Sequence, residues 1–282
     1  MRILFNFGYE KKTMKQALLV GAMLLTPALS FAQDCNTPEQ MQLLEKLYPK
    51  QQRISRLGET RVLNEQVPSA CKVWSAHPEY MIIANSWVDA KVAQEDIFET
   101  DFEVVLVDRA TGTVKSRYYG EGVLPSDAVY LSSLEIDTAP YKLKADQLAF
   151  GVRVMHTGSS GPNPFNSTEL NLFVPQNEKL LPLLKNLELN TSGGEWDTSC
   201  NGAFYQIESV IQVANTKTKG YFDLRLKQQQ KITTNVFNTR KDECESKLRS
   251  QQVVINQLKF NGTEYRLVSQ KAFGDWDQYI PK

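Results

Sequence analysis

The 282-residue chain has few cysteines and histidines and no excess of either charge, and each shortage excludes a class of function. Basic and acidic residues balance at 32 each, so there is neither a nucleic-acid footprint nor a polybasic membrane patch. The four cysteines form no CxxC pair, and both histidines, His77 and His156, lie far in sequence from any pair of cysteines, which excludes the usual zinc spacings. The sequence therefore predicts no metal, no cofactor and no nucleic-acid partner.

The chain also lacks an apolar run long enough to cross a bilayer, which needs roughly 20 residues. The longest such run, residues 17–29, follows Lys15 and precedes the small-x-small sequence Ser30-Phe31-Ala32. This is the layout of a secretory signal peptide. We therefore expect residues 1–32 to be the signal, with translation starting at Met14. The mature protein is expected to be periplasmic, with no membrane anchor.

The chain has four cysteines, an even number, as expected if they form disulfides in an oxidising compartment. Four cysteines allow three pairings. We favour Cys35–Cys71 with Cys200–Cys244, because each bridge then closes one local segment. In the chain-entropy model each loop contributes about 4 kcal/mol to stability.

The start of the mature chain has the features of a helix. Thr37 is a capping residue, Pro38 suits the first helical position, and Glu39 follows as an early acid. Apolar residues then recur at a spacing of three and four until Pro49. These are Met41, Leu43, Leu44 and Leu47. We expect a helix over about 37–48 that covers the rest of the domain and is tied to it by Cys35.

From residue 79 onward, hydrophobic and polar residues alternate, most clearly over 221–227, which is the pattern of a β-strand. Turn sequences at 108–112 (DRATG) and 261–262 (NG) predict hairpins. About ten to a dozen such strands indicate an all-β fold, an antiparallel meander forming a sandwich or barrel. A propeller-like arrangement is the runner-up, since no fixed-period repeat is present. We expect one domain over 33–282, with a helical turn possible at 179–187, where Pro182 excludes a long helix.

The sequence contains few combinations of residues that could act together in catalysis. His156 precedes a loop containing Ser159 and Ser160, but GSSGP lacks the final glycine and the following helix of a nucleophile elbow. A polar loop that closes a hairpin is the favoured interpretation. His77, next to Pro78, is expected to be a solvated turn residue. The sequence thus favours a protein that is not an enzyme.

Three acids, Glu99, Asp101 and Glu103, alternate along one predicted strand and so share a face. They could hold a hard cation such as calcium, but the chain has no DxDxDG loop. We expect them instead to lie on the solvated face of an edge strand, where charge deters aggregation.

Two tryptophans lie between acids, Trp196 in Glu-Trp-Asp and Trp276 in Asp-Trp-Asp. Aromatic faces beside acids are suited to sugars. Trp196 lies near Cys200, so covering a disulfide within a tight loop is the structural alternative. Together with Tyr205 and His156, these tryptophans are the candidate binding residues.

Three segments resemble uncharacterised secreted proteins of Gram-negative bacteria. They are AFGVRV at 149–154, TELNLF at 168–173, and GEWD at 194–197 followed by CNG at 200–202. The resemblance covers about the middle third of the mature chain. It implies a periplasmic β protein and supplies no activity.

The leading hypothesis is a non-catalytic binding or inhibitory module that recognises an envelope protein or a glycan. An envelope assembly or structural factor is the first alternative. A hydrolase that uses His156 is the second, and it requires a nucleophile or carboxylate within hydrogen-bond reach of that histidine.

Overall fold

The computed structural model describes residues 35–49, 52–54, 58–91, 98–269 and 273–280, which belong to one compact unit. The predicted signal peptide, residues 1–32, lies outside the described residues. No helix in the described ranges is long and apolar enough to span a membrane.

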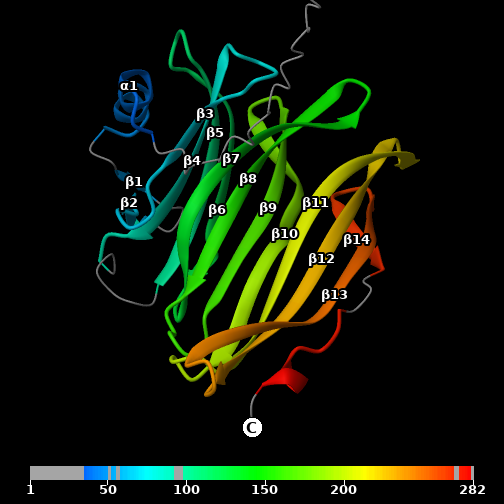
Figure 1. The fold of residues 1–282 in the computed structure, drawn as a ribbon. Helices are drawn as coiled ribbons and strands as arrows, with labels where there is room; N and C mark the ends of the chain where they lie inside the picture. Colours follow the sequence, from blue (N-terminus) through cyan, green and yellow to red (C-terminus); the bar gives the residue numbers. More distant parts are fainter. Residues whose placement is uncertain (1–34, 50–51, 55–57, 92–97, 270–272, 281–282) are drawn as a thin grey trace, which may run out of the picture. The chain divides into compact units, whose positions relative to one another are not determined.

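The described chain contains one α-helix, one short 3-10 helix and fourteen strands (Figure 1). In chain order these elements are α1 (Pro38–Leu47), β1 (Gln52–Ile54), β2 (Thr60–Leu63), β3 (Ala70–Val73), β4 (Tyr80–Asp89), β5 (Phe98–Asp108), β6 (Val114–Ser126), β7 (Val129–Lys144), β8 (Gln147–Gly158), β9 (Phe165–Gln176), β10 (Lys179–Trp196), β11 (Gly202–Thr218), β12 (Tyr221–Asn238), β13 (Glu243–Phe260), β14 (Tyr265–Ser269) and η2 (Asp277–Tyr279).

All fourteen strands join into one mixed sheet that does not close into a barrel. Strands β1 to β6 form a first antiparallel meander, and β7 to β14 form a second. A parallel bridge between Arg117 of β6 and Lys179 of β10 connects the two. Figure 1 shows the long strands of the second meander side by side. The predicted all-β fold with one short helix is confirmed, and of the arrangements left open, the barrel is excluded.

The largest core cluster joins the two meanders. It combines Ile82 and Val104 from the first with Ile136, Val152 and Val154 from the second, all 0% exposed. A second cluster, built mainly of leucines, lies among β7 to β10 and β12 to β14. Burying this much apolar surface is the main driving force that holds the meanders in one unit.

Helix α1 covers part of the first meander. The Thr37 hydroxyl accepts from the Gln40 amide, and the Gln40 side chain accepts from the Thr37 amide, which forms a capping box. Leu43 packs against β3 to β5, and the Cys35–Cys71 disulfide ties the preceding segment to β3. The predicted helix and this disulfide are confirmed. Met41, expected on the buried face, is 52% exposed, because it lies outside the stripe that faces β4 and β5.

Both predicted hairpins form. Gly112 and Gly262 adopt positive φ angles of 65° and 120° in turns that connect β5 to β6 and β13 to β14. The possible helical turn at 179–187 is wrong, since this segment is the first part of β10. Pro182 lies at a register shift between β9 and β10, a position in a sheet where the missing amide N–H is tolerated.

Candidate functional site

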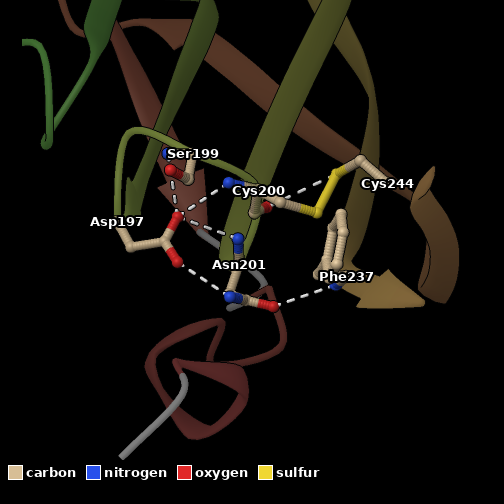
Figure 2. Close-up of a disulfide and its surroundings, with 6 residues drawn as sticks. All are labelled: Asp197, Ser199, Cys200, Asn201, Phe237 and Cys244. Atoms are coloured by element: carbon tan, nitrogen blue, oxygen red, sulfur yellow. Dashed lines mark hydrogen bonds between the residues drawn. A yellow bond between two sulfur atoms is a disulfide. The ribbon is translucent and has the colours of Figure 1, made fainter. Parts of the chain in front are cut away.

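The loop between β10 and β11 is organised by one carboxylate (Figure 2). Oδ1 of Asp197 accepts from the backbone N–H groups of Ser199, Cys200 and Asn201 at 3.0, 2.7 and 3.0 Å. Its Oδ2 accepts from the Asn201 side chain at 2.7 Å, and Asn201 in turn accepts from the Phe237 amide of β12 at 3.0 Å. The loop is therefore fixed to the neighbouring strand by hydrogen bonds.

The predicted Cys200–Cys244 disulfide also forms, with its Cα atoms 5.7 Å apart, and links this loop to β13 (Figure 2). The backbone N–H of Cys200 and the other donors around Asp197 hold the pKa of its carboxyl below the ordinary value. The GEWD and CNG sequences at 194–202 therefore form one structural unit. The Asp197 carboxylate binds the backbone of the turn, and the disulfide of Cys200 anchors the turn to β13.

Two glycines of β10 make room for two aromatic rings of β11. Gly193 pairs with Tyr205 and Gly194 with Phe204. A Cβ on Gly194 would lie 2.4 Å from the Phe204 ring, and one on Gly193 would lie 2.7 Å from the Tyr205 hydroxyl. Both rings therefore lie directly over glycine backbone, Phe204 on one face of the sheet and Tyr205 on the other, because neighbouring strand residues alternate.

Beside Phe204 the sheet has a polar hollow of about 400 Å³. Cross-strand pairing places one side chain from each of four strands in a row along it. We call these residues the polar row: Asn166, Ser192, Gln206 and Lys231. Thr233, the cross-strand partner of Phe204, extends the lining on β12.

Much of the hydrogen-bonding capacity in this hollow is unused. Ser192, Lys231 and Thr233 make no side-chain hydrogen bond to any other described residue. Oδ1 of Asn166 accepts from the Thr157 hydroxyl at 3.2 Å, and Nε2 of Gln206 donates to Glu208 at 2.7 Å. The Asn166 amide nitrogen and the Gln206 carbonyl oxygen keep their capacity for a ligand.

The four candidate binding residues are not brought together. Trp196 lies on the face of the hollow, with its ring 6.2 Å from that of Phe204, while its indole N–H donates to the Gly161 carbonyl at 2.8 Å. Tyr205 belongs to the lining of the hollow, but its side chain is directed to the opposite face by strand alternation, and its ring packs on that of Trp276 with centroids 5.0 Å apart. Trp196 therefore fixes the 158–164 loop beside the hollow, and Tyr205 with Trp276 holds the C-terminal segment on the sheet.

His156 lies apart from the other three. It pairs with Ser167 of β9, one residue from the pair Thr157–Asn166, so its side chain faces away from the hollow. It is 9% exposed, burial lowers the pKa of its imidazole, and that imidazole makes no hydrogen bond to any described residue. Ser159 and Ser160 instead hold the 158–164 loop through Ala128 and Asn163. The partner that the hydrolase hypothesis requires is not found among the described residues.

The expectation for the acids of β5 is wrong for two of the three. Asp101 and Glu103 are 0% exposed, and only Glu99 lies on the surface. The reason is that side chains from the end of α1 and from β1, β2 and β6 reach these acids and supply cations and donors. The arginines are Arg53, Arg61 and Arg117.

Glu103 is almost fully paired. Its Oε1 faces Arg53 at 2.9 Å and Arg117 at 3.1 Å, while its Oε2 accepts from the Tyr48 hydroxyl at 2.8 Å and the Trp87 indole at 3.0 Å. Burial and the adjacent carboxylate raise the pKa of Tyr48, which keeps its hydroxyl a donor. This cluster is closed to ligands and fastens the N-terminal segment to the sheet. In the described part of the chain, no group of three or more His, Cys, Asp or Glu residues could hold a metal ion.

Sequence reasoning missed the polar row. Successive members are 14 to 26 positions apart in the sequence and belong to no motif. The Gly193-Gly194 pair was the one local signal, because glycines within a strand often mark a close approach of other groups. Comparison with family models, curated proteins and solved structures finds no match for this chain.

Proposed function

We propose that this protein is a periplasmic, non-catalytic binding module, and that the polar hollow recognises a glycan of the cell envelope. The apolar run at 17–29, with its cleavage sequence, supports export. The two disulfides independently indicate an oxidising, extracytoplasmic compartment.

One observation carries the choice of ligand: the polar row presents unused amide, hydroxyl and ammonium groups in a hollow with aromatic rings at its edge. Sugars combine closely spaced hydroxyl groups, which donate and accept hydrogen bonds, with a C–H face that packs on aromatic rings. Amides and hydroxyls match both properties of a sugar hydroxyl. A protein partner would need a contact area of about 800 Å² on each side, whereas a hollow of this size suits a small hydrophilic ligand.

The proposal is tested by screening the mature protein on an array of envelope oligosaccharides and measuring the hits by calorimetry. We expect Gln206→Ala to weaken binding by tenfold or more, because it removes a central member of the row. The matched control is Gln257→Ala, an exposed glutamine of β13 outside the hollow, which should bind like the wild type.

Mass spectrometry of the glycan after prolonged incubation should show no cleavage. Absence of any glycan binding, or equal loss in the two variants, would contradict the proposal. Cleavage of the glycan would contradict its non-catalytic part.

A further inference from the structure

A second cavity, of about 520 Å³, lies where the ends of β4 to β6 meet those of β7 to β9. Its apolar wall includes Trp74, Leu148 and Val174, and its polar lining includes Lys115, Lys144 and Gln147. We call it the end cleft. It is distant from the polar hollow, because Asn166 and Pro175 lie nine residues apart on β9, or roughly 30 Å along the strand.

Two buried polar atoms belong to side chains that line the end cleft. The indole nitrogen of Trp74 has no hydrogen-bond acceptor, although this residue is only 3% exposed, and Oε1 of Gln147 has no donor. A buried indole N–H normally has a partner. Trp87 and Trp196 follow this rule, since their indoles donate to Glu103 and to the Gly161 carbonyl. Trp74 is therefore an exception that calls for an explanation.

Trp74 is also held firmly in place. Its ring packs on that of Phe150 with centroids 5.2 Å apart and on that of His77 at 4.6 Å. Its backbone amide donates to the Tyr80 carbonyl at 3.0 Å. The Trp74 ring thus has a fixed position in the wall of the cleft, which is what a preformed binding site requires.

One lysine of the end cleft, Lys144, is available to an anion. Lys144 has no carboxylate partner among the described residues, and its ammonium lies 4.0 Å from the centroid of the Tyr221 ring. Lys115 lies 3.7 Å from Asp108, a contact on the protein surface. Asp146 is the one acid in the lining, and because Lys115 already lies beside Asp108, Lys144 is the cation that an anion would meet. An anion that enters would gain a charge-assisted hydrogen bond.

We propose that the end cleft binds a small amphiphilic anion, an apolar body that carries a carboxylate. The body packs against Trp74, Leu148 and Val174, and the carboxylate pairs with Lys144. One ligand oxygen accepts the hydrogen bond from Trp74. This site is independent of the glycan hollow and does not rest on it.

The test is a titration of the ¹⁵N-labelled protein with octanoate, followed through the indole N–H resonances. Trp74→Phe assigns the relevant signal. We expect octanoate to shift the Trp74 resonance saturably and to leave that of Trp196 in place, because the Trp196 indole is already bonded. The neutral isostere 1-octanol should bind at least tenfold more weakly.

Lys144→Met keeps most of the side chain and removes the charge, and it should raise the octanoate Kd about tenfold. Lys247→Met, an exposed lysine of β13, is the matched control and should leave the Kd unchanged. The proposal is overturned if the Trp74 resonance does not move, if octanol binds as well as octanoate, or if the two lysine variants behave alike.

Discussion

Replacing Glu103 by glutamine tests whether the buried acid cluster fastens the N-terminal segment to the sheet. The substitution preserves side-chain shape and removes one charge. Glutamine has one oxygen and one NH₂ group where glutamate has two oxygens. Its NH₂ must therefore face either the two arginines or the donors Tyr48 and Trp87. In either orientation, the NH₂ group of the glutamine lies against hydrogen-bond donors in a place where the glutamate has an accepting oxygen.

The magnitude follows from the burial of the partners. Removing one member of a buried ion pair costs about 3–5 kcal/mol. Arg53 and Arg117 keep 21% and 42% of their side chains exposed, so water can hydrate them after the change. We therefore expect the lower end of the range, about 3 kcal/mol.

Urea unfolding of the oxidised protein measures this loss. With an m-value of about 3 kcal/mol/M, the midpoint should fall by about 1 M. Glu99→Gln is the matched control, since it is the same change on the same strand at an exposed position, and it should cost less than about 0.5 kcal/mol. If the two variants unfold at the same urea concentration, the buried contacts of Glu103 do not stabilise the fold.

Three further predictions concern the β10–β11 region. Replacing both Cys200 and Cys244 by serine opens a loop with a sequence separation of 44 and should cost about 4 kcal/mol, measured by urea unfolding. Gly194→Ala should cost about 1–3 kcal/mol through overlap with Phe204, whereas Gly161→Ala, with no atom within 4 Å, should be neutral; equal melting temperatures would exclude the overlap. The pKa of Asp197 is depressed in the folded protein, so its stabilisation is present above the ordinary value and lost as pH falls through the folded value. Asp197→Asn should therefore differ from wild type more at pH 7 than below about pH 4, and a pH-independent difference would contradict this.

Local signals predicted much of the fold. Thr37 and Pro38 marked the helix start, Gly112 and Gly262 marked two hairpins, and compartment chemistry with local pairing led to both disulfides. Each of these inferences depends on residues close in sequence, or on the rule that the cysteines of an exported protein form disulfides, which leaves three possible pairings for four cysteines. Such signals do not require knowledge of which strand lies beside which.

The errors and omissions share one cause, long-range pairing. Alternation along β5 correctly placed Asp101 and Glu103 on one face, but what covers that face depends on Arg53 and Arg61, which are 40 to 50 positions away. The polar row and the end cleft likewise combine distant strands. No local pattern carries that information.

Whether the polar hollow binds a glycan is tested by mapping the backbone amide shifts of the ¹⁵N-labelled mature protein on addition of an envelope oligosaccharide. We predict saturable shifts centred on Asn166, Ser192, Gln206 and Lys231 across the four strands. Shifts confined to another surface, or none with any envelope glycan, would contradict it.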